Sequence, residues 1–286
     1  MHKTRPQTFD PVGRCIYCDA TGVKLTEEHI IPKGMRGTLR LPDASCERCA
    51  CKTSLFEGVC QRNMFPTARA MWGLYGRRNR GVKRKRSGRP TAFPVLLDGR
   101  DELVGLSEYP FSIMLPLLDR PGIFAGRSPD AGFPDFTPDE RTWRWFDAQA
   151  PARAERILQH RKAREIKVVH EIPYTAFCKL IAKIGHSLAA AHRCEFEPWL
   201  RKIILSPRSD PIEEAPYLIG LASEDTVARF TEELIPNDAF RIGLMDVPSD
   251  NPDLTLLSAL IQVFCNVNAP VYEVVVGRLK QPFKGR

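Results

Sequence analysis

Two Cys-x-x-Cys pairs carry the clearest chemistry in this chain of 286 residues. The first pair is Cys15 and Cys18, and the second is Cys46 and Cys49. Four thiolates in two short-spaced pairs suit tetrahedral zinc, because each pair clamps one edge of the tetrahedron from a tight turn. The loop between the pairs is longer than in a minimal zinc ribbon. The spacing therefore predicts a structural zinc site that pins a further piece of structure inside the loop.

The other five cysteines are less informative. Cys51 offers a competing register, in which Cys49 or Cys51 is the fourth ligand, although Cys-x-Cys is the less usual clamp. The remaining four are scattered, and we expect them to be buried as small apolar residues: Cys60, Cys178, Cys194 and Cys265.

Between the two pairs lies Glu28-His29, in the run Thr-Glu-Glu-His-Ile-Ile-Pro at positions 26–32. Together with the cysteines and the segment 44–57, this run resembles the HNH endonucleases of the ββα-metal superfamily, in the variety pinned by a zinc knuckle. The resemblance covers roughly the first quarter of the chain. It implies a first strand that carries the catalytic histidine, a hairpin that Gly34 and Gly37 fit, and a helix over 46–57.

The function implied by the resemblance is metal-dependent hydrolysis of nucleic-acid phosphodiester bonds, most readily of DNA. Such hydrolysis needs a deprotonated water and a cation on the scissile phosphate. His29 is the natural general base, because imidazole titrates near neutrality. The carboxylate of Glu28 suits magnesium or manganese. Adjacent strand residues point to opposite faces, so the two side chains share a site only if a turn or bulge intervenes.

The chain departs from the family pattern at two positions. Family members often carry an asparagine in the hairpin that orients the histidine, and an asparagine or histidine directly after the last cysteine that ligates the catalytic metal. Leu41 and Ala50 stand near those positions here. On the predicted helix, Glu57 lies seven residues past Ala50 and on its face, so Glu57 is the best replacement ligand. Weaker candidates are Asp43, Thr53 and Ser54.

Three functions stay open at this point. The first is a nuclease in which His29 activates water while Glu28 and Glu57 hold the catalytic cation. The second is a catalytically degenerate zinc-knuckle protein that binds nucleic acid without cutting it. The third is a scaffold or regulator that acts through the C-terminal part of the chain, and self-association is equally open.

The charge distribution favours a nucleic-acid partner. Residues 1–90 contain 19 Lys and Arg against 7 Asp and Glu, whereas the whole chain has a net charge of +8. The excess is sharpest in a basic arm with almost no apolar residues, which we expect to contact phosphate in a salt-sensitive, sequence-independent way. Its cations are Arg77, Arg78, Arg80, Lys83, Arg84, Lys85, Arg86 and Arg89.

No stretch approaches the roughly 20 apolar residues of a membrane span. The N-terminus lacks the apolar segment of a signal peptide, so we expect a cytoplasmic protein whose cysteines meet a reducing environment. The fold class predicted is α+β. Residues 1–76 would form the zinc-stapled ββα module, 77–92 the arm or linker, and 93–286 an α+β accessory domain.

Within the accessory domain, residues 93–97 and 102–106 read as two strands around a turn. The segment 109–151 is rich in proline and glycine and is expected to be irregular, although Trp143 and Trp145 alternate as in a strand. Residues 152–166 read as a charged helix and 174–192 as a long amphipathic one. Its polar residues Lys179, Lys183 and His186 are expected on a solvated face.

Three C-terminal segments, 240–244, 255–264 and 271–276, look like strands. The last two are expected to form an antiparallel hairpin against the long helix.

Overall fold

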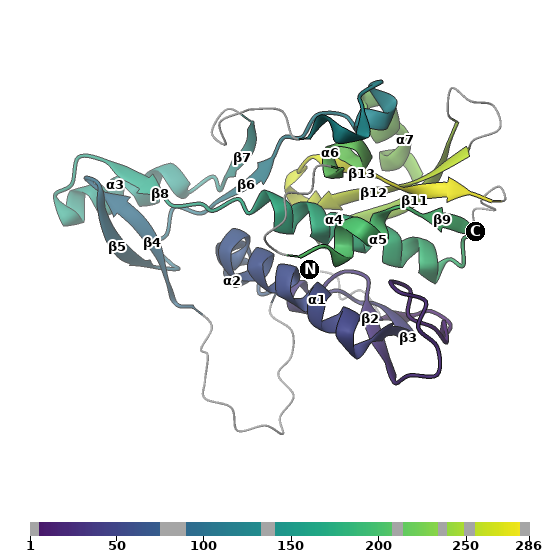
Figure 1. Ribbon diagram of the computed structural model, residues 1–286. Coiled ribbons are helices and arrows are strands. Elements are labelled where there is room, and N and C mark those ends of the chain that lie inside the picture. The colour runs from purple at the N-terminus through teal and green to yellow at the C-terminus, as the bar shows by residue number, and fades with distance from the viewer. Residues whose placement is uncertain are drawn as a thin grey trace.

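The computed structural model describes residues 6–74, 90–132, 141–207, 214–233, 239–248 and 255–280. The protein has the α+β class predicted from the sequence. Figure 1 shows the long helix α4 between the largest sheet and the N-terminal module, with a smaller lobe extending from this body. No helix in the described part of the chain is long and apolar enough to cross a membrane.

The N-terminal module is a hairpin followed by a helix, in the order that the motif predicted. Strand β2 (Leu25–His29) pairs antiparallel with β3 (Leu39–Cys46), and the short β1 (Gln7–Thr8) pairs parallel with β3. A 3-10 turn, η1 (Lys33–Met35), lies between the two long strands. Gly37 is required there, because a Cβ at that position would stand 1.8 Å from the carbonyl oxygen of Ile31. Helix α1 (Glu47–Val59) begins directly after Cys46.

Helix α1 continues into a π-helical turn, η2 (Cys60–Met64), and then α2 (Pro66–Met71). Aromatic contacts join this end of the module to the rest of the protein. The ring of Phe65 lies 6.5 Å from that of Phe177 and 5.2 Å from that of Phe264. The boundary at 77–92 falls largely outside the described residues, and the segments on its two sides share one hydrophobic core.

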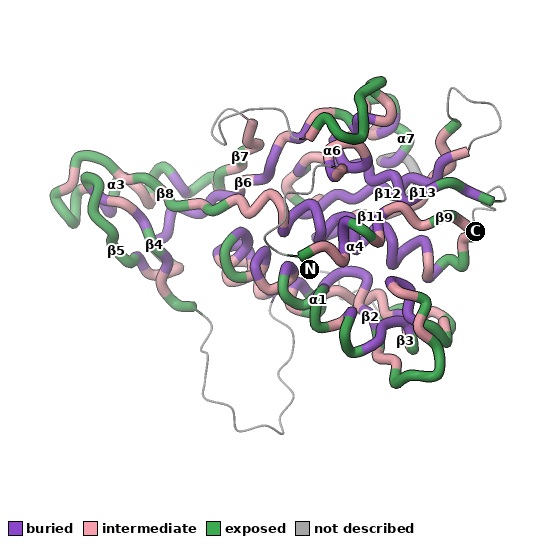
Figure 2. The backbone as a smooth tube through the Cα atoms, in the orientation of Figure 1, coloured by how far each residue is buried: buried purple, intermediate pink, exposed green. Residues whose placement is uncertain are grey.

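Helix α4 (Tyr174–Ala191) confirms the predicted long helix, yet it is buried almost all round (Figure 2). Its apolar face packs on the sheet, and its opposite face packs on α1 and on α5 (Leu200–Leu205). The expectation of a solvated face was therefore wrong. Lys179, Lys183 and His186 are all buried, because the N-terminal module and the segment after α5 cover the side of the helix that carries them.

The largest sheet has the order β10-β13-β12-β11, with β9 (Phe196–Pro198) also paired to β13. Its strands are β10 (Ile219–Leu221), β11 (Phe240–Pro248), β12 (Thr255–Val263) and β13 (Val271–Leu279), and every pairing is antiparallel. The predicted hairpin of the last two strands against the long helix is confirmed. Two further helices are α6 (Ala215–Leu218) and α7 (Glu224–Glu233).

The smaller lobe contains a three-stranded sheet of order β5-β4-β8 and one helix. The predicted hairpin is confirmed as β4 (Ala92–Leu97) and β5 (Arg100–Gly105), whose turn places Asp98 and Gly99 at positive φ. Helix α3 (Ala150–Arg161) ends earlier than predicted, because Lys162 takes the left-handed conformation and the chain then enters β8 (Ile166–Val168).

The segment 109–151 is more regular than we expected. Strands β6 (Ser112–Pro116) and β7 (Thr142–Phe146) pair antiparallel within it, and short 3-10 turns η3 (Gly122–Phe124) and η4 (Pro129–Ala131) lie between them. The alternation of Trp143 and Trp145 therefore did indicate a strand. Composition misled the prediction here, because proline and glycine occupy the connections rather than the paired residues.

Candidate metal centre and the carboxylate pair beside it

The four predicted zinc ligands converge. The Sγ atoms of Cys15, Cys18, Cys46 and Cys49 all lie within 4.8 Å of one another, and Cys18 and Cys46 have their sulfurs 3.7 Å apart. Tetrahedral zinc with Zn–S bonds of about 2.3 Å requires sulfur separations of about 3.8 Å. The cluster therefore fits a structural zinc ion, and a bound zinc would tie the turn at 15–18 to the start of α1.

The competing cysteine register is excluded by the same geometry, since Cys51 is exposed and is not part of the cluster. Cys60 and Cys178 are buried, as predicted, whereas Cys194 and Cys265 are only half-buried. Among the residues that the structure describes, no second group of three or more His, Cys, Asp and Glu side chains is arranged to hold a metal.

The zinc knuckle is fastened to the second half of the chain by polar contacts. Arg201 of α5 donates to the carbonyl oxygen of Ile16 at 2.9 Å and forms a bidentate pair with Asp19. The Nε2 of His186 lies 2.8 Å from the same carbonyl oxygen, so this nitrogen carries the proton and donates. The hydroxyl groups of Tyr17 and Ser187 are 3.0 Å apart. The knuckle and the helices α4 and α5 therefore form one unit.

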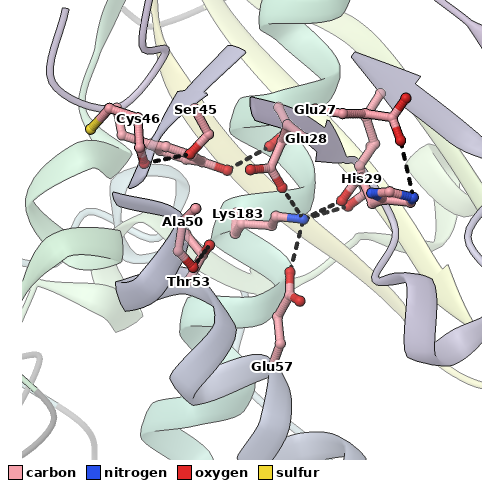
Figure 3. Close-up of polar contacts among 12 residues, drawn as sticks. Glu27, Glu28, His29, Ser45, Cys46, Ala50, Thr53, Glu57 and Lys183 are labelled. Carbon is pink, nitrogen blue, oxygen red and sulfur yellow. Dashed lines mark hydrogen bonds and ion pairs between the residues drawn. The ribbon is translucent and has the colours of Figure 1, made fainter. Parts of the chain in front are cut away.

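Glu28 and Glu57 also converge, as the nuclease hypothesis required, but they converge on a lysine (Figure 3). The Nζ of Lys183 lies 2.5 Å from Oε1 of Glu28 and 2.9 Å from Oε1 of Glu57. It also donates to the carbonyl oxygens of His29 and Ile30. The Lys183 side chain is wholly buried, and those of Glu28 and Glu57 are 7% and 18% exposed.

The charge state of this cluster follows from two opposing effects. Burial acts to lower the pKa of Lys183, but the carboxylates of Glu28 and Glu57 outweigh it and raise that pKa above its ordinary value. Burial raises the pKa of Glu28, and the Lys183 ammonium opposes that rise. With four oxygen acceptors around it, Lys183 is held as an ammonium ion at neutral pH.

The imidazole of His29 contacts Glu27 and not the carboxylates of this cluster, although the charges of Lys183 and Glu57 act on it. Its Nε2 lies 3.5 Å from Oε1 of Glu27, the residue two positions earlier on the same face of β2. A register shift does occur in β2, but between Thr26 and Glu28, so Glu28 and His29 remain on opposite faces. Burial lowers the pKa of His29 while Glu27 opposes the change, and the imidazole is therefore neutral at pH 7.

Sequence reasoning missed Glu27 and Lys183 as members of these sites. The spacing of Glu27 and His29 on a strand was the available signal for the first. Arg40, on the neighbouring strand, adds a third charge to this surface, with Nη1 3.7 Å from Oε2 of Glu27. The result is an imidazole with a carboxylate and a guanidinium next to it.

The weaker ligand candidates do not join either cluster. Thr53 donates its hydroxyl to the carbonyl of Ala50 at 3.1 Å, and Ser54 donates to that of Cys51 at 2.8 Å. Asp43 is exposed and has a positive φ of 47°. Leu41 is buried and pairs across the ladder with Glu28, so it packs in the core of the module.

The predicted basic arm lies outside the described residues. This applies to every one of its cations, which are Arg77, Arg78, Arg80, Lys83, Arg84, Lys85, Arg86 and Arg89.

Comparison with known proteins found no match to the chain among family models, curated proteins or solved structures.

Proposed function

We propose that this is a nucleic-acid-binding protein built on a zinc-stapled module of HNH type, in which a lysine has taken the position of the catalytic cation. The observation that carries the proposal is the contact of the Lys183 ammonium with both Glu28 and Glu57. These are the two carboxylates that the nuclease hypothesis assigns to magnesium or manganese.

The energetics oppose an exchange of Lys183 for a metal. A divalent ion bound to both carboxylates would displace an ammonium that is wholly buried. Leaving one partner of a buried ion pair without its counterpart costs about 3 to 5 kcal/mol. The geometry opposes it as well, because a cation held by Glu28 and Glu57 and a water activated by His29 would lie on opposite faces of β2.

The charge of the chain supports nucleic acid as the partner. Lys24, Lys33 and Arg36 are exposed on the module itself, and the basic arm follows it directly in the sequence. Contacts between such cations and phosphates give binding that weakens steeply as salt rises and depends little on base sequence.

The test is a pair of assays on the zinc-loaded protein. Binding of a labelled duplex oligonucleotide is measured by fluorescence anisotropy at rising salt, and plasmid nicking is measured with magnesium or manganese. We expect salt-sensitive binding and no nicking. Absence of binding at low salt would refute a nucleic-acid role and favour the scaffold function. Nicking that requires the divalent ion and is lost in His29→Ala would refute the non-cleaving role.

A second function, metal-dependent HNH endonuclease, is favoured by the surface of β2 that carries His29. Its imidazole is neutral and partly exposed, as a general base requires, and a carboxylate oxygen of Glu27 lies 3.5 Å from it. On this alternative the cation would be held through Glu28 only after Lys183 withdraws. Nicking by wild type that falls in both His29→Ala and Glu28→Gln would establish the enzyme.

A further inference from the structure

A cleft of about 920 Å³ lies between the smaller lobe and the β6-β7 hairpin, far along the chain from the zinc cluster. Its walls come from β4, α3 and β8 on one side and from β6 and β7 on the other. Figure 1 shows these elements side by side, beyond the end of α4 that begins at Tyr174. The volume is at the upper end of the range for ligand-binding sites, roughly 300 to 1,000 Å³.

Strand β7 divides its side chains between the core and this cleft. Trp145 packs inward, with its ring 5.7 Å from that of Phe111 and 6.2 Å from that of Trp72. Arg144 and Phe146 alternate with it, are exposed, and line the cleft. Trp145 is thus packed against the core, and Phe146 is the aromatic side chain at the cleft.

The wall opposite β7 is the edge of a sheet. All three residues of β8 line the cleft together with Val169 and His170, so both faces of the strand border it. In the described sheet β8 pairs only with β4, which leaves its other edge toward the cleft. Val169 and Phe146 are 42% and 55% exposed, and large apolar residues with so much exposure are few in the described chain.

Every ionisable residue that lines the cleft is basic, namely Arg144, Lys167 and His170, and no carboxylate is among the lining residues. The Nε2 of His170 lies 2.9 Å from Oγ of the buried Ser112, which fixes the ring over the β6-β7 hairpin. Burial, with Arg144 adding to it, lowers the pKa of His170 to about 4, so the ring is uncharged at neutral pH. The cleft therefore combines apolar walls with positive charge.

We infer that this cleft binds single-stranded nucleic acid, with an unpaired base stacked on Phe146 and phosphates contacted by Arg144 and Lys167. The inference rests on the proposed nucleic-acid-binding function and adds the form of the ligand. An aromatic ring within a basic groove is the usual arrangement for single strands, because every base has a face that can stack. A duplex buries those faces, so only its phosphates could meet the cleft. A peptide strand added to β8 is the competing occupant, and the absence of any lining carboxylate favours the polyanion.

The test uses a fluorescein-labelled thymidine oligonucleotide and a mixed-sequence duplex of the same length, with affinities measured by anisotropy. Phe146→Ala should weaken single-strand binding roughly tenfold, as expected for the loss of one stacked base. The double variant Arg144→Gln with Lys167→Gln should weaken it and flatten its salt dependence. Duplex binding should be unchanged in Phe146→Ala, because that variant removes a stacking face and no phosphate contact.

Matched controls on the same lobe are Leu103→Ala, an exposed apolar residue, and Arg100→Gln with Arg156→Gln, a pair of exposed cations outside the cleft. Both controls should bind the single strand as wild type does. Equal losses in control and cleft variants, or no loss in the cleft variants, overturn the inference.

If the wild-type protein binds the duplex but not the single strand, the inference is overturned. The proposed nucleic-acid-binding function would still stand. The same binding result is expected if the edge of β8 receives a peptide. Failure to bind either oligonucleotide refutes the proposed function and the inference together.

Discussion

The zinc cluster and the Glu28-Glu57 site belong to the same short module, and each gathers groups that carry negative charge, but the two sites balance that charge in different ways. At the first, four cysteine sulfurs surround a space of the size that zinc fills, and no lysine or arginine nitrogen pairs with them among the described contacts. At the second, two carboxylates already hold a cation supplied by the chain itself, Lys183. The comparison predicts that folding requires a metal at the first site and none at the second.

The largest effect should come from removing thiolates. Cys46→Ser with Cys49→Ser should abolish zinc binding and unfold the module, because structural zinc contributes about 10 to 16 kcal/mol in zinc-finger peptides. Zinc content by atomic absorption and circular dichroism measure the two consequences. Cys51→Ser, an exposed cysteine of the same helix, should retain both zinc and fold. A fully folded, zinc-free double variant would show that the cluster is not structural.

The next largest effect should come from removing the internal cation. Lys183→Met leaves two buried carboxylates facing each other and should lower the free energy of unfolding by about 3 to 5 kcal/mol, measured by urea denaturation. Adding Glu28→Gln and Glu57→Gln to that variant should restore most of the loss, because amides carry no charge. A single variant as stable as wild type would mean that the contact contributes nothing.

Acidification should have an intermediate effect on stability. It acts through His186, whose Nε2 donates to the carbonyl oxygen of Ile16 in the zinc knuckle. Burial lowers the pKa of His186 to about 4, while the unfolded chain titrates near 6.5. Between these values the unfolded state binds the extra proton, so stability is lost as pH falls from 6.5 toward 4, by up to about 3 kcal/mol from this group.

The check is the pH dependence of the unfolding free energy in wild type, His186→Gln and His160→Gln. Wild type and the exposed His160 control should share one slope, and the His186 variant should have a shallower one. Three equal slopes would show that His186 does not contribute to the loss of stability at low pH.

The smallest effect concerns the surface pair. Glu27→Gln removes the charge that opposes the lowering of the His29 pKa, so that pKa should fall further. Stability should change by no more than about 0.5 kcal/mol, since Glu27 is exposed. Titration of the His29 ring by NMR measures the pKa, with Glu165→Gln as a distant control. An unchanged His29 pKa would show that the charge of Glu27 does not act on the His29 imidazole.

The sequence predicted much of the fold because its strongest patterns are local. Cysteine spacing located the metal centre, and helical periodicity located α4 to within one residue at its end. Glu57 was placed near Glu28 by the family resemblance at Ala50 together with helix geometry, and both carboxylates do contact one cation.

The identity of that cation could not be predicted, since it depends on a contact between residues more than 120 positions apart. Lys179, Lys183 and His186 fall at helical spacing. Polar residues in that pattern are typical of a solvent-exposed helix face. Only the packing of α1 and α5 on that face, with Glu28 of β2 meeting Lys183, converts it into an interior. The direction of His29 was likewise hidden, because it depends on where in β2 the register shifts.

Lys183 is proposed to occupy the cation position between Glu28 and Glu57, and manganese binding tests this proposal most directly. Zinc-loaded wild type and Lys183→Ala are titrated with Mn²⁺, and the free ion is followed by electron paramagnetic resonance. We predict no bound manganese in wild type at millimolar concentrations, and one bound ion in the variant if its carboxylates remain in place. Stoichiometric binding by wild type that disappears in Glu28→Gln would contradict the claim.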